Sequence, residues 1–96
     1  MHIYLAGPMT GYPNDNIEAF NEAAAKLRAE GHIVFNPAEN FIADPKVDRR
    51  RCLALDLAWI CLTAEGIVML PGWGGSRGAL AEHTTAIALN LPITYL

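Results

Sequence analysis

Hydrophobic and polar positions along this chain alternate between two periods. Four short apolar runs predict β-strands: His2–Ala6, Ile33–Phe35, Gly66–Leu70 and Pro92–Leu96. Between these runs, apolar residues recur every three or four positions, which predicts helices over about 16–30, 48–63 and 77–89. The pattern therefore predicts strands and helices in strict alternation along the chain. Only Phe41–Lys46 is predicted to be irregular.

Local signals mark the ends of these elements. Asp15 or Asn16 can cap the first helix, and Gly31 fits the position just after its end. Asn90 fits the C-terminus of the last helix. The third strand, Gly66–Leu70, lacks polar alternation, so we expect it to be buried on both faces. The inward stripe of the first helix is predicted to hold Ile17, Phe20, Ala24 and Leu27.

Strands separated by helices of this length form a parallel sheet with right-handed crossovers. We expect one domain over residues 1–96: a flavodoxin- or Rossmann-like three-layer α/β sandwich with four parallel strands in the order 2-1-3-4. In such sheets a ligand lies beyond the carboxyl ends of the strands, where successive connections leave to opposite faces. That place lies between strands one and three. It predicts a binding cleft between two glycine-rich loops, Ala6–Gly11 and Pro71–Gly78.

Composition and charge narrow the class of protein. The chain is 52% hydrophobic, which argues against disorder, and its net charge is −3. The basic triplet Arg49–Arg51 is too short to indicate a nucleic-acid polymer as partner, and a charged helix face is favoured over a phosphate contact. No signal peptide or membrane-spanning run is recognisable, so no membrane partner is expected. A domain this small is expected to form a homodimer or a higher homo-oligomer.

Two cysteines, Cys52 and Cys61, lie nine residues apart in one predicted helix. At about 1.5 Å of rise per residue they are beyond the reach of a disulfide. Neither their spacing nor their neighbours suggest a metal site. A reducing, cytoplasmic location is therefore expected.

The segment Gly72–Gly78 leads from a strand into a helix, and it has two readings. Its backbone N–H groups, the Ser76 hydroxyl and the Arg77 charge can hold a phosphate at a helix N-terminus. Equally, it is a tight turn in which Ser76 is the N-cap. Trp73 can stack on a base or cover the core, with similar weight.

Two acids and a phenol are the candidates for catalysis. Glu82 lies within two turns of the start of the last helix, on a face of small residues. Taken alone, a solvated charge is the favoured reading for Glu82. Asp56 lies in an apolar helical stretch and points either to solvent or into the cleft, while Tyr4 lies on the central strand. If the three converge, they suit glycosyl transfer, in which one carboxylate attacks the anomeric carbon and another acid assists. The neighbouring His83 is expected to pack against other side chains instead.

Several strings together resemble a known family. Tyr4-Leu5-Ala6-Gly7-Pro8, Asp56-Leu57-Ala58-Trp59, and Ser76-Arg77-Gly78 with Glu82 are similar to the nucleoside 2-deoxyribosyltransferase superfamily. Within it, the chain looks most like the 2′-deoxynucleoside 5′-monophosphate N-glycosidases. The strings Tyr4–Gly11, Leu70–Trp73 and Ser76–Glu82 also look like a small, largely uncharacterised branch from phages and bacteria.

The resemblance implies a reaction and a role for each matching residue. Glu82 matches the nucleophile that attacks C1′ of the deoxyribose, Asp56 the assisting acid, and Tyr4 the tyrosine beside the nucleophile. Gly7 matches a glycine near the sugar, and Ser76 and Gly78 match the loop that holds the 5′-phosphate. The implied activity is hydrolysis of the N-glycosidic bond, or deoxyribosyl transfer between bases, without cofactor or metal. The alternative is a non-catalytic module that binds or sequesters deoxynucleotides or deoxynucleosides on the same fold.

Overall fold

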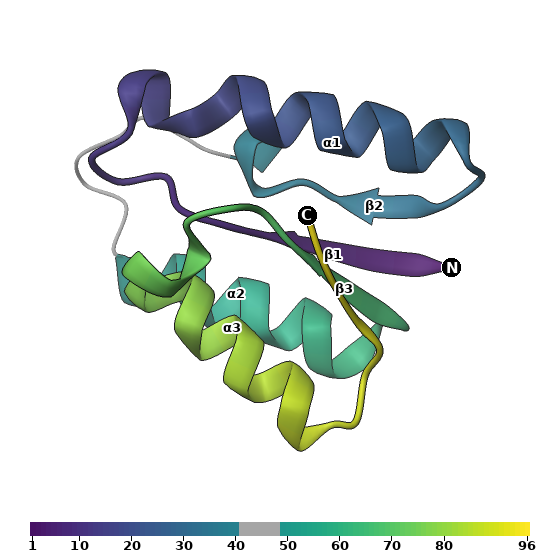
Figure 1. Ribbon diagram of the computed structural model, residues 1–96. Helices are drawn as coiled ribbons and strands as arrows, with labels where there is room; N and C mark the ends of the chain where they lie inside the picture. Colours follow the sequence, from purple (N-terminus) through teal and green to yellow (C-terminus); the bar gives the residue numbers. More distant parts are fainter. Residues whose placement is uncertain (41–48) are drawn as a thin grey trace.

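The computed structural model describes residues 1–40 and 49–96 and has the predicted α/β architecture (Figure 1). Four parallel strands form one sheet in the order β2-β1-β3-β4, as expected. The strands are β1 (His2–Ala6), β2 (Ile33–Phe35), β3 (Gly66–Met69) and β4 (Ile93–Tyr95). The helices are α1 (Ile17–Ala29), α2 (Arg49–Leu62) and α3 (Arg77–Ala88). Three short 3-10 turns complete the described chain: η1 (Pro13–Asn16), η2 (Pro37–Asn40) and η3 (Trp73–Gly75).

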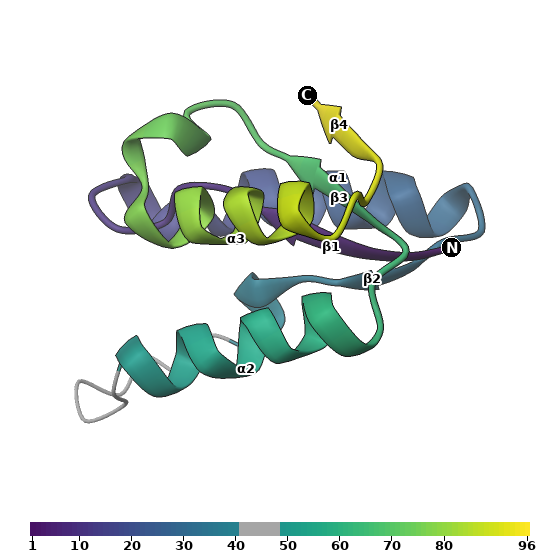
Figure 2. The same ribbon diagram turned by 90° about the horizontal axis from the view of Figure 1, so that it is seen from below.

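Helices cover the two faces of the sheet unequally. Helix α1 lies on one face, and α2 and α3 lie side by side on the other (Figures 1 and 2). The connection from β1 therefore leaves to the opposite face from the connection after β3. Because β1 and β3 are neighbours in the sheet, their carboxyl ends form the predicted switch point.

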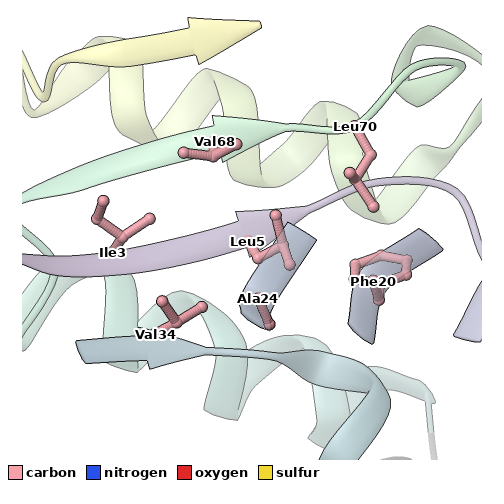
Figure 3. Close-up of a cluster of buried hydrophobic side chains, with 7 residues drawn as sticks. All are labelled: Ile3, Leu5, Phe20, Ala24, Val34, Val68 and Leu70. Atoms are coloured by element: carbon pink, nitrogen blue, oxygen red, sulfur yellow. The ribbon is translucent and has the colours of Figure 1, made fainter. Parts of the chain in front are cut away.

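Successive residues of β1 supply two separate cores. Side chains along a strand point alternately to opposite faces. Ile3 and Leu5 pack with Phe20 and Ala24 of α1, in the cluster drawn in Figure 3. Tyr4 and Ala6 belong to the second cluster, on the side of α2 and α3. Every residue of β3 is buried, which confirms the prediction for that strand.

Helix ends follow the sequence signals, with one difference. Gly31 lies just past the end of α1 with a φ of 96°, and Asn90 follows α3 with a φ of 55°. Asn16 takes the N-cap position of α1, but its side chain makes no capping bond. Its amide instead donates to the carbonyl oxygen of Pro8 at 2.9 Å. The side chain therefore stabilises the loop after β1 and does not cap the helix.

The two glycine-rich loops approach each other closely. A Cβ built on Gly7 would lie 2.7 Å from the Cβ of Leu70, at the end of β3. Gly72 has a φ of 85°, and the Tyr12 hydroxyl lies against its Cα. A side chain at Gly7 would push the loops apart, and the positive φ at Gly72 favours glycine there.

The remaining expectations concern the chain around α2. Helix α2 begins at Arg49 in the structure, whereas the predicted start at Asp48 and the irregular segment Phe41–Lys46 lie outside the described residues. Cys52 and Cys61 are both free and exposed. Among the described residues, no helix has the length and apolar character to cross a membrane.

Candidate functional site

A tyrosine and a glutamate from opposite ends of the chain meet beneath the sheet. Tyr4 lies in the middle of β1 and is completely buried. Its hydroxyl donates to Oε2 of Glu82 on α3, and the two oxygens are 2.5 Å apart. Glu82 is 6% exposed. Apart from Asn36, Glu82 is the one buried polar or charged side chain of the described residues, and burial of a carboxylate is costly unless it is paired or protonated.

A second carboxylate faces the same hydroxyl from α2. Asp56 is half-buried and interacts with both the Tyr4 hydroxyl and the Glu82 carboxylate. Helices α2 and α3 pack beside each other, which brings the two acids to one place under β1. The structure thus brings together Tyr4, Asp56 and Glu82, the three residues that the sequence proposed as a set. Asp56 is the most exposed of the three, so the set meets solvent on the α2 side.

Aromatic rings, which the sequence analysis did not assign to the site, form its walls. Phe35 pairs with Tyr4 in the parallel register of β1 and β2, and the two rings stack at 5.2 Å between centroids. Trp59 of α2 lies 6.2 Å from the Tyr4 ring and 5.2 Å from the Phe35 ring. A signal was present in the sequence, since Trp59 follows Asp56 by three residues and therefore lies near it on a helix.

This apolar environment changes the acidity of all three groups. Burial raises the pKa of Glu82 to about 8, with a further rise from the charge of Asp56 and an opposing effect of the Tyr4 hydrogen bond. Burial also raises the pKa of Asp56 to about 6, against the hydrogen bond with Tyr4. Burial, followed by the two neighbouring carboxylates, raises the pKa of Tyr4 well above its ordinary value. Tyr4 therefore stays a neutral phenol, while the two acids titrate near neutral pH.

The arrangement holds one proton between two carboxylates over an unusual range. Between about pH 6 and pH 8 the pair carries one proton, because the two pKa values bracket that range. The Tyr4 hydroxyl touches both acids and can accept a proton from one while it donates to the other. A pair with one ionised and one protonated carboxyl group is the chemical requirement of glycosidic bond cleavage.

The loop before α3 is built around Ser76. Its Oγ accepts a hydrogen bond from the backbone N–H of Ala79 at 3.2 Å, so Ser76 is the N-cap of α3. The capping bond agrees with the interpretation of the loop as a tight turn, but it does not exclude phosphate binding at the same loop. The hydroxyl retains its own proton for a ligand. A Cβ on Gly78 would meet only the Ser76 Oγ, at 4.0 Å, so the space beside the hydroxyl is open. Arg77 is exposed at the first position of the helix.

Trp73 occupies a different place from the two acids. Its ring stacks on His83 with 4.2 Å between centroids and lies 5.9 Å from Tyr95 of β4. His83 Nε2 and the Tyr95 hydroxyl are 2.7 Å apart. As expected, His83 packs against neighbours, and Trp73 is half-buried against the core cluster that contains Tyr4. One face of Trp73 is thus already covered, and its stacking on a base stays a prediction.

Two further observations concern ligands. A hollow of about 410 Å³ lies on the α1 side, and its lining includes Ala19, Lys26, Leu70 and Leu96 but none of the three site residues. Over residues 1–40 and 49–96, no group of three or more His, Cys, Asp or Glu side chains is placed to hold a metal ion.

Fold and site together define a Rossmann-like α/β protein with a buried phenol and two carboxylates on one face of its central strand. A family model described as "Domain of unknown function (DUF4406)" matches residues 1–95, and the chain belongs to that family. No curated protein and no solved structure matches the chain. What the site does must therefore be argued from its own residues.

Proposed function

We propose that this protein hydrolyses the N-glycosidic bond of 2′-deoxynucleoside 5′-monophosphates, with deoxyribosyl transfer between bases as the related activity. The observation that carries the proposal is the hydrogen bond from Tyr4 to Glu82, with Asp56 at the same hydroxyl. Three groups that a double displacement at C1′ requires thus lie in one apolar place. The likeness of the surrounding strings to the nucleoside 2-deoxyribosyltransferase superfamily supports the same chemistry.

The first step forms an ester with the sugar. A carboxylate oxygen of Glu82 bonds to C1′ while the bond from C1′ to the base nitrogen breaks. The electron pair of that bond leaves with the base, whose nitrogen takes a proton from Asp56. Because the resting pair holds its proton on Glu82, the Tyr4 hydroxyl first passes a proton to Asp56 and leaves Glu82 ionised.

The second step releases the sugar. Water attacks C1′, the bond from C1′ to the Glu82 oxygen breaks, and its electron pair returns to the carboxylate. Asp56, now ionised, takes the proton of the water. If a second base attacks in place of water, the outcome is transfer. No metal or cofactor enters either step.

The loop before α3 suits the phosphate end of the substrate. Glu82 lies six positions after Ser76, which is about 9 Å along a helix. A deoxyribose and its 5′-phosphate can bridge that length. The Ser76 hydroxyl, the Arg77 side chain and the N–H groups of the first turn then face the phosphate. Gly7 lies at the carboxyl end of β1 and allows the backbone to approach the sugar.

The direct experiment is to incubate the protein with each dNMP and each deoxynucleoside and to measure free base by chromatography. We expect base release from at least one dNMP, and a loss of at least about 1000-fold in kcat for Glu82→Ala. The matched control is Glu22→Ala, an exposed glutamate of α1, which should keep the wild-type rate. Equal rates for Glu82→Ala and the wild type would exclude Glu82 as the nucleophile.

One observation favours the second candidate, a module that binds nucleotides without turnover. Glu82 is only 6% exposed, so little of its carboxylate is accessible to a substrate. A site that stays closed could bind the phosphate at the Ser76 loop and leave the base intact. Calorimetric binding of a dNMP without any base release would support this function over hydrolysis.

A further inference from the structure

The loop between β3 and α3 has few side chains of its own to hold it in place. Gly72, Gly74 and Gly75 are all exposed. A Cβ built on Gly74 or Gly75 would meet no heavy atom within 4 Å, so that side of the backbone is open. The N–H of Gly75 donates to the Gly72 carbonyl at 3.1 Å, and the next N–H, of Ser76, donates to the carbonyl of Trp73 at 3.0 Å. Both bonds lie within the loop, so they shape the turn without joining it to the rest of the fold.

Trp73 supplies the large side chain of this loop, and its ring lies against two others. It stacks on His83 of α3, with 4.2 Å between the ring centroids and 29° between the ring planes. The ring of Tyr95, on the edge strand β4, lies 5.9 Å from Trp73 and 5.8 Å from His83. The Tyr95 hydroxyl is 2.7 Å from Nε2 of His83, which fixes the imidazole. These three rings, which we call the ring cluster, join the loop to the helix and to the edge strand.

The ring cluster and the candidate site share one turn of α3. Glu82 and His83 are adjacent, so their side chains project about 100° apart. Glu82 points to Tyr4 beneath the sheet, whereas His83 points to Trp73. Trp73 is therefore tied to the helix that carries the proposed nucleophile. Because the Trp73 carbonyl accepts the hydrogen bond from the Ser76 N–H, the ring cluster also sets where Ser76 lies relative to Glu82.

We propose that Trp73 is a positioning residue: by stacking on His83 it holds the loop in the conformation that receives the 5′-phosphate, and it thereby gives the site a preference for deoxynucleotides over deoxynucleosides. This inference rests on the proposed function. Trp73 acts through the backbone of Ser76 and does not touch the substrate. A loop with three glycines has many accessible conformations, and a loop that is held before binding loses less conformational entropy when the phosphate binds.

The alternative role for Trp73 is to stack on the base, and two observations argue against it. One face of its ring is already covered by His83. Trp73 also lies only three positions before Ser76, the proposed phosphate contact, whereas the base and the 5′-phosphate are attached to different parts of the sugar. The two roles predict different results. Loss of a loop anchor weakens the binding of deoxynucleotides alone, whereas loss of a base contact weakens the binding of deoxynucleosides as well.

The first experiment tests the anchor without substrate, by amide hydrogen exchange followed by NMR. In Trp73→Ala the N–H groups of Gly75 and Ser76 should exchange at least about tenfold faster than in the wild type, while those of β1 keep their rates. Trp73→Phe retains a ring that can stack on His83 and should restore most of the protection. The matched control is Thr84→Ala, which changes an exposed residue of α3 and should affect neither amide. Equal exchange in Trp73→Ala and the wild type, or the same acceleration in Thr84→Ala, overturns the proposal.

The second experiment compares KM for a dNMP with KM for the matching deoxynucleoside. Trp73→Ala should raise KM for the dNMP at least about tenfold, while KM for the deoxynucleoside and both kcat values stay within about threefold of the wild type. Trp73→Phe should recover most of the loss. An equal rise in KM for both substrates would show that Trp73 contacts the base or the sugar. That result, or an unchanged KM for the dNMP, overturns the proposal.

Calorimetry with the same dNMP separates this inference from the proposed function. If the wild type binds the dNMP but releases no base, hydrolysis is excluded, and the affinity for the dNMP decides the role of Trp73. An affinity at least about tenfold weaker in Trp73→Ala then supports the anchor, and an unchanged affinity overturns it. If the wild type hydrolyses the dNMP and Trp73→Ala does so with the same KM, the anchor alone is wrong. A wild type that neither binds nor hydrolyses any dNMP overturns both.

Discussion

The Tyr4 hydroxyl and the Glu82 carboxylate are 78 residues apart in sequence and 2.5 Å apart in space. Neither residue is exposed, and the bond between them joins the central strand to the helix that follows β3. Asp56 lies at the same hydroxyl; burial raises the pKa of both acids, and hydrogen bonding to Tyr4 opposes that rise. Most of what can be tested about the site follows from it.

Removal of the Tyr4 hydroxyl should affect both stability and rate. Tyr4→Phe keeps the ring that stacks on Phe35 but deletes the donor to a buried carboxylate. We expect a loss of about 1–3 kcal/mol in the free energy of unfolding by urea at pH 9, where Glu82 is ionised. Base release should fall by about 10- to 100-fold, because the proton path between the acids is lost. Tyr95→Phe is the control, since Tyr95 is exposed and its loss should cost less than about 1 kcal/mol. Equal effects of the two variants would show that the buried bond has no special role.

The pH dependence of the rate should be bell-shaped with a maximum near pH 7. Below about pH 6 both acids are protonated and no nucleophile is available. Above about pH 8 both are ionised and no acid assists the leaving base. The limbs belong to the coupled pair rather than to single residues. Measurement of kcat/KM from pH 4.5 to 9.5 checks the profile. Asp56→Asn should remove the assisting acid and abolish the alkaline limb of the profile. If kcat/KM of the wild type does not change between pH 5 and pH 9, the paired roles of the two acids are contradicted.

Protein stability should fall as the pH rises through the same range. Burial raises the pKa of Glu82 from 4.5 to about 8, so the folded protein binds the proton more tightly than the unfolded chain does. The resulting stabilisation is fully present below about pH 4.5 and is lost by about pH 8. We therefore expect the unfolding free energy of the wild type to drop by about 4 kcal/mol more than that of Glu82→Gln between pH 5 and pH 9. Parallel curves for the two proteins would refute a raised pKa at Glu82.

Gly7 should not tolerate even one methyl group. In Gly7→Ala the new Cβ meets the Leu70 Cβ at 2.7 Å, so the loop after β1 must move away from the end of β3. We expect a loss of about 1–3 kcal/mol in the unfolding free energy, measured by urea titration. Gly74→Ala serves as the control because no heavy atom lies within 4 Å of its Cβ position. A change of less than about 0.5 kcal/mol in both variants would mean that the loops adapt freely.

Ser76 should separate phosphate recognition from helix capping. Ser76→Ala removes the bond to the Ala79 N–H. It also removes the hydroxyl that we propose to contact the 5′-phosphate. We expect a stability loss of about 1 kcal/mol together with a tenfold or greater rise in KM for a dNMP, but not for the matching deoxynucleoside. Ser76→Thr retains a hydroxyl for both tasks and should behave much like the wild type. If KM rises equally for both substrates, the loop does not recognise the phosphate.

The sequence by itself determined the order and type of the elements and the topology of the sheet. Apolar runs of three to five residues, separated by helical periodicity, leave few alternatives to a parallel sheet, because the crossover rules act on local pattern. The same rules placed the switch point between β1 and β3. Gly31 and Asn90 ended their helices as predicted, since a positive φ is a local requirement.

Only the tertiary structure decided the chemistry of the individual side chains. Taken alone, Glu82 was more readily read as a solvated charge, yet packing of α3 under β1 buries it against Tyr4. The Asn16 side chain fastens the Pro8 carbonyl rather than capping α1, because the loop folds back over the helix start. Exposure of Leu55 and Leu62 was equally invisible, because apolar residues occur on every side of α2 beyond its first turn. Secondary structure follows from neighbours along the chain, whereas burial, pKa and exposure depend on residues brought together from distant segments.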